Sequence, residues 1–410
     1  MSGTFAGPPA REQAASATVG AQQQGPERTV ATSRGTVAYF IGEDWFFCSH
    51  FVPMARAARD HGFDIVVLTR PGERSAEIES HGFRVVTLDF SRNDLNPLRK
   101  LATVRRVAAI LARERPVVLH NVALSYAILG TLAGRMARVP AIVNAITGLG
   151  YLLVAPSPLV RLLRAGLWRT LPPLFNNRRV AFLFENPDDA AMAVRHRWTV
   201  PARVTIVPGA GVDTDHFSAL PAPTDTPLRV ALVGRMLWQK GPDLAVEAKR
   251  ELDRRGVPCE LWLVGRSDPD NPRAIPEETL RRWAAEPGIR WAGFCPDVRE
   301  IWRACHVAVA PSRGGEGLPR SLIEAAACGR PLVASDVPGS REIVRPGVNG
   351  LLVPPGDALA LADAVQRLAG DPELRHAYGA ASRSIAAAEY RDDIVGETIA
   401  DLYRRIAGPG

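Results

Sequence analysis

The sequence predicts an α/β fold in which two Rossmann-like domains face each other. The chain has 410 residues, which is too long for one ordinary domain and comfortable for two. Hydrophobic residues make up 46% of it and charged residues 23%, as is typical of soluble globular proteins. Short apolar runs alternate with longer helical stretches, and this rhythm begins afresh after a proline-rich segment at 218–227. Such a rhythm is typical of parallel sheets covered by helices.

The first domain is expected over residues 35–217. Residues 1–34 are rich in Gly, Ala, Gln, Ser and Thr and lack the apolar core of a signal peptide, so we expect a disordered tail there. After the first strand we expect a loop and then a helix that ends at Gly62. Strands are predicted at 36–41, 63–70, 83–90, 116–121, 141–146, 180–186 and 204–213, and helices at 97–114 and 124–137.

The second domain is expected over residues 218–390, with the proline-rich segment as the linker. A terminal helix should follow it at 391–406. Strands are predicted at 228–236, 259–265, 289–294, 306–312, 331–336 and 350–354. Helices are predicted at 276–286, 297–304, 319–328, 357–369 and 372–389.

The charge of the chain is concentrated in its first half. The formal net charge is +7, and residues 99–179 hold thirteen basic residues against one acidic residue, Glu114. Such a one-sided segment indicates an anionic partner, which can be nucleic acid, phospholipid or a phosphorylated substrate. A solvated surface in an arginine-rich proteome is the alternative. The uncharged stretches at 116–134 and 139–160 carry polar residues, glycines or prolines, so any membrane contact is expected to be peripheral.

Cysteine and histidine spacing gives no sign of a metal site. None of the 5 cysteines forms a C-x-x-C pair, and the 8 histidines include no H-E-x-x-H pattern. The cysteines are also too few and too scattered for a disulfide framework, so a reducing cytosol is the expected setting.

Two cations follow the first strand of the second domain. Gly234 ends that strand, Arg235 comes next, and Lys240 lies just before a helix. A diphosphate needs the close backbone approach that glycine permits, together with cations. A connecting loop with incidental surface charge is the alternative for this motif.

A glycine-rich loop, 311–319, leads into a second candidate ligand-binding helix. Its glycines allow the backbone to wrap around a ligand, and the start of the helix favours a phosphate. Glu316 in the loop and Glu324 in the helix are eight positions apart, which suits a ligand rich in hydroxyl groups. The alternative is that one is an ordinary loop carboxylate and the other an ordinary helix-surface residue.

Three motifs in the first domain follow its strands. Glu43 and Asp44 come after the first strand, where the domain would contact a ligand, although Asp44 could instead cap the next helix. His120 ends a buried strand, and a structural role is the alternative for it. Gly148 and Gly150 suggest special backbone dihedrals or close ligand approach, without the third glycine of a dinucleotide fingerprint.

Taken together, these residues resemble the family-4 retaining glycosyltransferases, which have the two-domain GT-B fold. The second half carries G-R-M-x3-K-G, L-V-G-R, G-F-C-P-D-V, P-S-x3-E-G-L-P-R-S-L-I-E-A and D-V-P-G-S-R-E-I-V. The first half carries E-D-W-F-F-x-S-H, T-G-L-G-Y, F-E-N-P-D-D and G-V-D-T-D-H-F. These motifs look like the branch that builds capsule, O-antigen or glycoprotein glycans on polyprenyl-diphosphate carriers.

The resemblance implies roles for the motif residues. Arg235 and Lys240 would hold the donor diphosphate and stabilise the leaving phosphate. Glu316 would face the transferred sugar, and Glu324 would bind the ribose hydroxyls. Further implied contacts are Gly234, Gly317 and Leu318 at the donor, Arg266, Phe294 and Val298 around the base, Asp44 and His120 near the reacting sugar, and Glu43, Gly148 and Gly150 on the acceptor side.

The resemblance also implies a reaction and partners. The enzyme would move a hexose or N-acetylhexosamine, with retention, from a nucleotide sugar such as a UDP-sugar to a polyprenyl-diphosphate-linked saccharide. No metal, cofactor, protein nucleophile or nucleic-acid partner is implied. Helix 391–407 would pack back on the first domain, and segments 97–113 and 151–179 would dock on the anionic inner face of the cell membrane.

Two other functions fit parts of the pattern. A nucleotide-sugar 2-epimerase of the same fold would need no lipid acceptor, but the G-R-x4-K-G and Glu-x7-Glu spacings argue against it. A non-catalytic anion-binding protein would explain the basic segment alone. That segment lacks aromatic interleaving, which argues against a nucleic-acid ligand.

Overall fold

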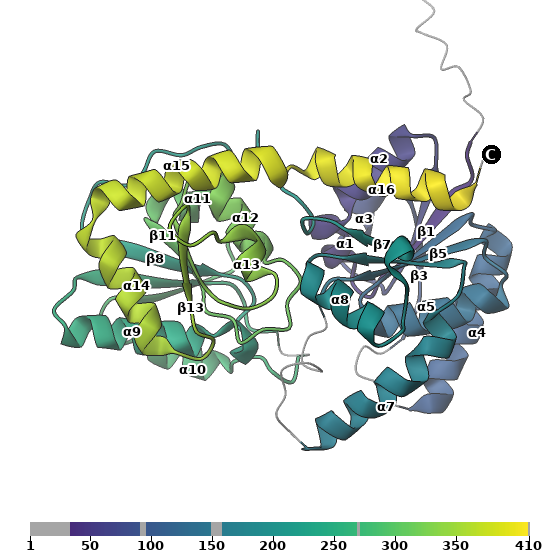
Figure 1. The fold of residues 1–410 in the computed structure, drawn as a ribbon, viewed down its shortest axis with the longest axis horizontal. Coiled ribbons are helices and arrows are strands. Elements are labelled where there is room, and N and C mark those ends of the chain that lie inside the picture. Colours follow the sequence, from purple (N-terminus) through teal and green to yellow (C-terminus); the bar gives the residue numbers. More distant parts are fainter. Residues whose placement is uncertain (1–32, 91–95, 149–157, 269–270, 409–410) are drawn as a thin grey trace, which may run out of the picture. The chain divides into compact units, whose positions relative to one another are not determined.

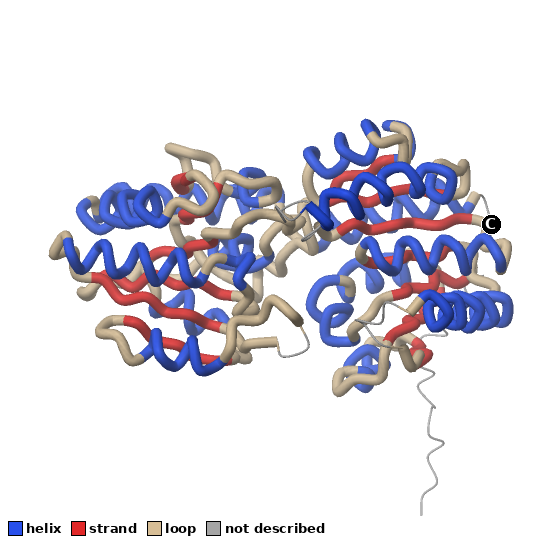
Figure 2. Tube along the Cα trace, turned by 90° about the horizontal axis from the view of Figure 1, so that it is seen from below, coloured by secondary structure: helices blue, strands red, loops and turns tan. Residues whose placement is uncertain are grey.

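A computed structural model gives the structure of residues 33–90, 96–148, 158–268 and 271–408. It contains two parallel sheets, each covered by helices on both faces (Figures 1 and 2). The predicted α/β fold class is therefore confirmed. The prediction of a disordered tail falls almost wholly on residues outside those described.

The first sheet has seven parallel strands in the order β3-β2-β1-β4-β5-β6-β7. Its two central strands pair in register through Val37–Phe40 and Val118–Asn121. The inner strands β1, β2, β4, β5 and β6 are buried on both faces or nearly so, which explains their continuous apolar runs, whereas the edge strands β3 and β7 are partly exposed. The strands are β1 (Thr36–Phe40), β2 (Asp64–Thr69), β3 (Arg84–Thr87), β4 (Val118–Val122), β5 (Ala141–Ile146), β6 (Val180–Phe184) and β7 (Val204–Ile206).

Two apolar cores lie on the faces of this sheet. On one face, Phe47, Met54 and Tyr403 are buried against the strands. On the other, Val107, Ala127 and Phe175 are buried. Tyr403 comes from the last helix of the chain, and the other residues come from helices of the first domain. These helices are α1 (Asp44–His50), α2 (Val52–Asp60), α3 (Ser75–Ser80), α4 (Pro97–Glu114), α5 (Leu124–Met136), α7 (Pro158–Phe175), α8 (Pro187–Arg195) and η1 (Pro201–Arg203).

The second sheet has six parallel strands in the order β10-β9-β8-β11-β12-β13. Its strands are β8 (Leu228–Val233), β9 (Cys259–Val264), β10 (Ile289–Gly293), β11 (Val307–Ala310), β12 (Leu332–Ser335) and β13 (Gly350–Val353). The covering helices are η2 (Trp238–Lys240), α9 (Pro242–Arg254), α10 (Glu277–Ala284), α11 (Val298–Ala304), α12 (Arg320–Ala327), α13 (Ser340–Ile343), α14 (Ala358–Gly370) and α15 (Pro372–Glu389). Helices α9, α10 and α14 cover one face, and α11, α12 and α15 the other.

The last helix, α16 (Asp392–Ala407), belongs by its contacts to the first domain. It packs along α2, whereas α15 packs on α12 of the second domain. Gly396 makes the approach to α2 possible, since a Cβ there would lie 2.8 Å from Cβ of Ala57. Contacts of this kind join both halves into one compact unit, Ser33–Gly410.

The structure differs from the sequence-based expectations at two helices. The loop expected after β1 is instead helix α1, because Phe47 and neighbouring aromatics bury themselves on the sheet at helical spacing. Helix α7 had no assignment, since its run of apolar and arginine residues is interrupted by Pro172 and Pro173. The helix nevertheless continues through both prolines and buries Leu171 and Phe175 against the first domain.

Among the helices in the described part of the chain, none combines the length and apolar character needed to cross a bilayer.

Candidate functional site

The central feature of the site is the point where the strand order of the second sheet reverses. β8 and β11 are neighbours there, and the connections that follow them run to opposite sides. In open parallel sheets, ligands bind at such a point beyond the carboxyl ends of the strands. The loops after these two strands converge, since Arg313 N donates to Gln239 O at 2.7 Å.

Lys240 and Glu316 form an ion pair between the two loops. The distance from Lys240 Nζ to Glu316 Oε1 is 2.6 Å, and their side chains are 21% and 12% exposed. Ser312 Oγ donates to the other carboxylate oxygen at 3.3 Å. Gly234 has φ +152°, and a Cβ on it would lie 3.3 Å from Cδ of Lys240. The glycine therefore leaves room for the lysine side chain to fold back over the strand end.

Arg235 lies beside aromatic and acidic partners. Its Nη1 is 3.1 Å from Asp268 Oδ2, and its guanidinium lies over the ring of Trp45, 5.7 Å from the centroid. Because Trp45 comes from α1, Arg235 connects the second domain with the loop region after β1. The arginine remains 39% exposed, which leaves it accessible to an anionic ligand.

The next two strands supply a flat surface beside these cations. The Arg266 guanidinium lies 4.5 Å from the ring centroid of Phe294. Phe294 is 56% exposed, which is unusual for a large aromatic side chain. Val298 begins α11, and Asp297 caps that helix through the N–H of Arg299. An exposed ring with a stacked guanidinium suits a planar base.

Glu324 is held by Arg320 one helical turn away. The distance from Arg320 Nε to Glu324 Oε1 is 2.8 Å. Burial raises the pKa of Glu324, and the positive charge of Arg320 opposes that rise. Pro319 is the N-cap of α12 and not its first residue, a difference of one position from the prediction.

Backbone from the first domain lies directly against the glycine-rich loop. A Cβ on Gly148 would come within 2.7 Å of the nitrogen of Gly317 and 2.8 Å of the oxygen of Gly315. Gly148 also has φ +114°, which favours glycine. The predicted Gly150 falls outside the residues that the structure describes.

Glu185 joins the two domains through a hydrogen bond that sequence reasoning missed. It directly follows β6, and its Oε2 accepts from the N–H of Leu318 at 2.8 Å. Burial raises its pKa to about 7, the Leu318 N–H opposes the rise, and the charges of Asp189 and Glu316 add to it. The resemblance assigned the Leu318 N–H to the donor, whereas here a carboxylate of the first domain accepts it. The signal was a carboxylate that ends a buried apolar run.

Asp44 and Glu43 are engaged within the first domain. Both oxygens of Asp44 accept backbone hydrogen bonds, from the nitrogens of Trp45 and Arg74 at 2.7 Å each. The side chain is only 3% exposed. Glu43 pairs with Arg70 at 2.8 Å. Asp44 therefore fixes the turn containing Arg74, and its predicted place beside the reacting sugar stays a prediction.

The predicted position of His120 is wrong. His120 lies in the middle of β4 and not at the carboxyl edge of the sheet, and its side chain is fully buried. The ring stacks on Tyr39 at 4.8 Å, and its Nδ1 is hydrogen-bonded to the hydroxyl of Tyr403 on α16. An apolar environment lowers its pKa to about 3. The contact with α16 could not be seen in the local sequence, which is why the structural role was underrated.

A different histidine lies near the cations of the site. His50, at the end of α1, has its Nδ1 2.6 Å from Ser49 Oγ and its ring 4.3 Å from that of Phe46. Burial, together with the positive charges of Arg320, Lys240 and Arg235, lowers its pKa to about 3. The ring is therefore neutral near pH 7. His50 was visible in the E-D-W-F-F-x-S-H motif, but no role was assigned to it.

Three positively charged side chains of the site lie around His50. Arg235, Lys240 and Arg320 act together on His50, which shows that they share one region. Within the described residues, no group of three or more His, Cys, Asp or Glu side chains is arranged to hold a metal ion. The arrangement suits an anionic ligand whose negative charge would meet these three cations.

Family comparisons identify the fold and the class of this site. Residues 227–371 match the family model described as "Glycosyl transferases group 1", and residues 36–170 match "Glycosyl transferase 4-like". The chain is a glycosyltransferase of the GT-B fold. The predicted family resemblance is thereby confirmed, and the loops after β8 and β11 lie within the group 1 match.

Individual relatives agree with this assignment. The chain is 25% identical over 370 residues, 87% of this chain and 95% of the relative, to the N,N'-diacetylbacillosaminyl-diphospho-undecaprenol alpha-1,3-N-acetylgalactosaminyltransferase of Campylobacter jejuni. It is 35% identical to the alpha-D-kanosaminyltransferase of Streptomyces kanamyceticus over 184 residues, 44% of this chain and 46% of the relative. The match thus spans about half the length of the second relative.

A solved structure shares the fold. The crystal structure of Anabaena HepE in complex with UDP and glucose superposes with a TM-score of 0.71 at 18% identity, over 90% of this chain and 99% of that one. At this identity the likeness concerns the GT-B fold alone.

Proposed function

We propose that this glycosyltransferase moves a hexose or N-acetylhexosamine, with retention of configuration, from a UDP-sugar to a saccharide carried on a polyprenyl diphosphate. The observation that carries the proposal is the Lys240–Glu316 pair, 2.6 Å apart, at the reversal point of the second sheet and beside Arg235. The Campylobacter relative, whose name specifies a diphospho-undecaprenol-linked acceptor, matches over most of its length.

The donor would occupy the carboxyl edge of the second sheet. Its base would stack on exposed Phe294 beside Arg266, and its ribose hydroxyls would bind Glu324. Its diphosphate would meet Arg235 and Lys240, the latter leaving Glu316. Glu316, released from the lysine, would then accept hydroxyl hydrogen bonds from the transferred sugar. HepE, a structure with the same fold, contains UDP and glucose.

The leaving diphosphate would be stabilised by the three cations. Preorganised positive charge acts on the charge that develops in the transition state, and removal of one such group typically costs about 10²–10³ in kcat. Because His50 is neutral, the nearby cations do not repel it, and its ring can donate or accept a hydrogen bond at the reacting phosphate or sugar. In this proposal the attack is front-face, the leaving phosphate assists it, and neither a metal ion nor a cofactor is required.

The acceptor diphosphate has a candidate hollow in the first domain. A cavity of about 360 Å³ is lined by residues after β3, at the start of α4 and at the start of α5. Its basic residues are Arg99, Lys100 and Arg106, and Tyr126 forms part of its wall. Tyr126 also contacts Gly42, where a Cβ would overlap its hydroxyl. The hollow thus adjoins the loop after β1, on the side of the site that faces the first domain.

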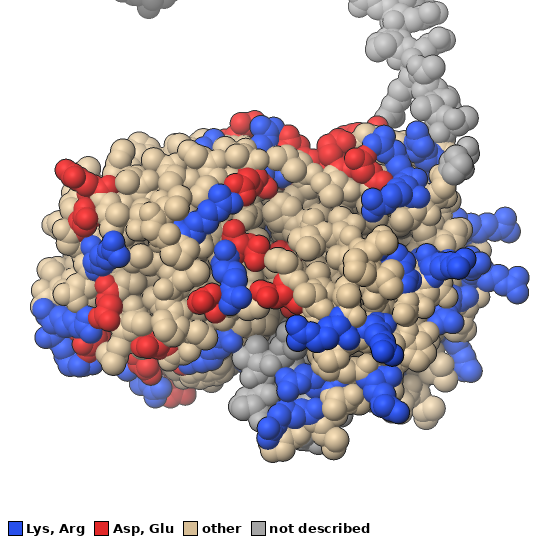
Figure 3. Space-filling view, in the orientation of Figure 1, with Lys and Arg blue, Asp and Glu red and all other residues tan. Residues whose placement is uncertain are grey.

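The surface around α4 and α7 suits an anionic membrane. Figure 3 shows Lys and Arg side chains gathered over these helices with few acidic ones. Apolar side chains project among them, with Leu98 74% and Leu162 70% exposed. Basic and apolar groups on the same surface favour binding in the headgroup region of a bilayer. In this proposal, the enzyme works at the inner face of the cell membrane.

The test is a transfer assay with purified full-length protein. UDP release would be measured from a panel of UDP-, GDP- and ADP-sugars, with and without an undecaprenyl-diphosphate-linked saccharide. We expect release that depends on the lipid acceptor, that survives EDTA and that gives a product with the donor's anomeric configuration by NMR. The Lys240→Gln variant should lose about 10²–10³ in kcat/KM, while exposed Arg367→Gln should not.

The alternatives give different outcomes in the same assay. A sugar isomerised without acceptor would identify a 2-epimerase. Transfer to a soluble acceptor alone would retain the transferase chemistry and refute the lipid carrier. Inverted product would refute retention, and no turnover with any donor would favour an anion-binding protein.

A further inference from the structure

A hollow of the second domain lies away from the donor loops. It measures about 1470 Å³ and is bounded by the linker 219–228, by the turns before β9, β11 and β12, and by α15. All these boundaries lie at the amino ends of the strands, whereas the donor groups follow the carboxyl ends. β8 has six residues, so the two edges are about 20 Å apart.

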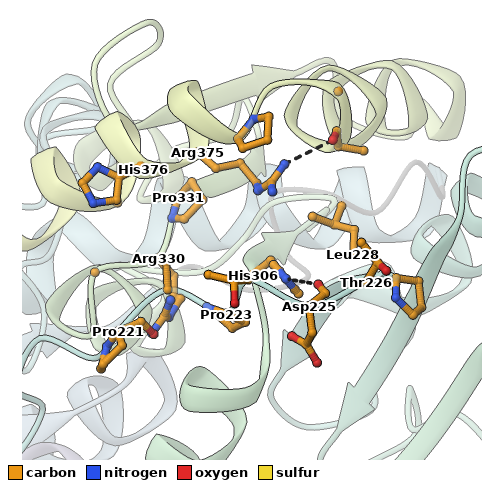
Figure 4. Close-up of a pocket in the computed structure, with 18 of the residues that line it drawn as sticks. Pro221, Pro223, Asp225, Thr226, Leu228, His306, Arg330, Pro331, Arg375 and His376 are labelled. Atoms are coloured by element: carbon orange, nitrogen blue, oxygen red, sulfur yellow. Dashed lines mark hydrogen bonds between the residues drawn. The ribbon is translucent and has the colours of Figure 1, made fainter.

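Its wall is rich in prolines and positively charged. Figure 4 draws Arg375 and His376, from α15, on one side of the hollow and Arg330, His306 and Asp225 on the other. Asp225 is the only acidic residue in the wall, and Arg229 neutralises it through two contacts of 2.7 and 2.8 Å. The hollow is therefore a cationic environment without a free carboxylate.

The clearest sign that the hollow binds an anion is Arg330, a buried arginine without a counter-ion. It is 1% exposed, and its Nη2 donates to the carbonyls of Leu220 and Pro221 at 3.0 and 2.7 Å. Its Nε has no hydrogen-bond partner among the described residues, and no carboxylate there forms an ion pair with it. A buried guanidinium without a counter-ion is costly. Burial accordingly lowers the pKa of Arg330.

Two more arginines of the wall share this pattern. Arg375 Nη1 donates to the carbonyls of Leu368 and Ala369, and Arg383 Nη1 to those of Phe217, Thr214 and Ala327. Neither forms an ion pair with a described residue. Many arginines elsewhere in this domain do pair with carboxylates, among them Arg229, Arg250, Arg255, Arg299, Arg313 and Arg345.

We propose that this hollow is a second ligand site, which binds a soluble phosphate or diphosphate ester and is separate from the donor site. The planar guanidinium group matches phosphate oxygens. In each of the three arginines only one Nη nitrogen donates to backbone carbonyls, which leaves the other Nη for a ligand. The proline-rich wall would cover the apolar or ring portion of the ester. The volume exceeds that of an ordinary small-molecule pocket, so an ester as large as a nucleotide fits.

The ligand would also contact the connection between the domains. Arg330 and Arg383 hold carbonyls of residues 214–221, which lead from the first sheet to the second. An anion that draws either guanidinium toward the hollow would weaken its hydrogen bonds to the carbonyls of this connection. Binding here is independent of which sugar the enzyme transfers.

The test uses inorganic pyrophosphate as the probe and isothermal titration calorimetry on full-length protein. Arg106→Gln/Arg235→Gln/Lys240→Gln serves as the background, because it removes cations from both the proposed acceptor hollow and the donor loops. We expect about one pyrophosphate per chain in that background. Adding Arg375→Gln should weaken binding at least tenfold, or about 1.4 kcal/mol, whereas the exposed control Arg367→Gln should leave it unchanged.

A second variant guards against misfolding of the first. Ala222 is an exposed wall residue of the linker, and Ala222→Trp would fill the hollow without removing a charge. It should weaken pyrophosphate binding as well. The proposal is overturned if the background variant binds no pyrophosphate, or if both wall variants bind as tightly as the Arg367→Gln control. It is also overturned if they reduce only binding to phosphatidylglycerol vesicles, since the site would then recognise a lipid surface.

Discussion

At the scale of single residues, two groups near the boundary between the domains have displaced pKa values. The carboxylate of Glu185 accepts from the Leu318 N–H, and burial raises its pKa to about 7. The imidazole of His50 lies near three cations, and its pKa is lowered to about 3. Both groups are therefore less charged than they would be in water.

Glu185 predicts a specific dependence of stability on pH. The folded state raises the pKa of Glu185 above its ordinary 4.5. Between that value and about 7, Glu185 therefore keeps a proton in the folded state that it loses in the unfolded chain. The contribution of Glu185 to stability should therefore fall as the pH rises from about 4.5 through about 7. Glu185→Gln keeps an oxygen acceptor for the Leu318 N–H and removes this titration. Urea unfolding of both proteins at pH 5, 6, 7 and 8 should show the variant gaining stability relative to wild type as pH increases. Parallel curves would contradict the assignment.

His50 predicts an effect on turnover. His50→Gln removes a neutral ring from the cationic site, and we expect kcat/KM to fall about tenfold or more, which corresponds to about 1.4 kcal/mol of transition-state stabilisation. Steady-state kinetics with the donor found in the transfer assay would measure it. His61→Gln, directly after α2 and paired with Glu397, is the matched control. An unchanged kcat/KM for His50→Gln would show that the ring is only structural.

At the scale of elements, α16 contributes Tyr403 to a buried polar cluster in addition to its apolar packing. The Tyr403 hydroxyl bonds to His120 and lies 2.8 Å from the Tyr39 hydroxyl, in a fully buried region. Helices α4 and α7, in contrast, present arginines and leucines to the outside. Buried contacts therefore position α16, whereas α4 and α7 leave side chains available at the surface.

Tyr403→Phe should lower the stability of the whole chain. The substitution leaves a buried nitrogen of His120 unpaired, and such a loss typically costs about 1–3 kcal/mol. Denaturant unfolding followed by circular dichroism would measure it. Exposed Arg404→Ala on the same helix should cost much less, and equal effects of the two would refute the importance of the buried bond.

Basic residues of α7 should control membrane binding. Arg161→Glu/Arg169→Glu reverses two exposed charges, so sedimentation with phosphatidylglycerol vesicles should fall severalfold, and the wild-type binding itself should weaken as salt increases. Arg367→Glu, exposed on α14, is the control for net charge. Unchanged sedimentation of the double variant would exclude this docking surface.

At the scale of the whole molecule, backbone of the two domains comes into close contact, and we expect activity to depend on this contact. Gly148 approaches Gly317 so closely that a Cβ would lie 2.7 Å from its nitrogen. Gly148→Ala should therefore reduce kcat at least tenfold through a displaced glycine-rich loop. Gly347→Ala carries a similar positive-φ strain, with φ +76°, but a Cβ there meets nothing within 4 Å. If both variants have the same kcat, strain alone would explain the effect.

Much of the fold was predictable because its signals are local. Helices α4 and α15 have the predicted bounds, since each begins with a proline at its first position and shows clear apolar periodicity. Helix α7 was not predicted, because two prolines inside a helix contradict the local rule and only packing compensates for them. The loops that hold Arg235, Lys240 and Glu316 were predicted as ligand-binding from glycine and charge spacing.

The sequence by itself determined the α/β class, the glycosyltransferase family and the candidate ligand-binding loops, because apolar runs, caps and contiguous motifs are formed by neighbouring residues. Only the tertiary structure decided which residues meet across the chain. It buried His120 under Tyr403, brought His50 to the cations, and paired Glu185 with Leu318. It also left Arg330 without a counter-ion in a hollow. Glu185 and Leu318 are 133 residues apart and His120 and Tyr403 are 283 residues apart, separations over which local propensity carries no information.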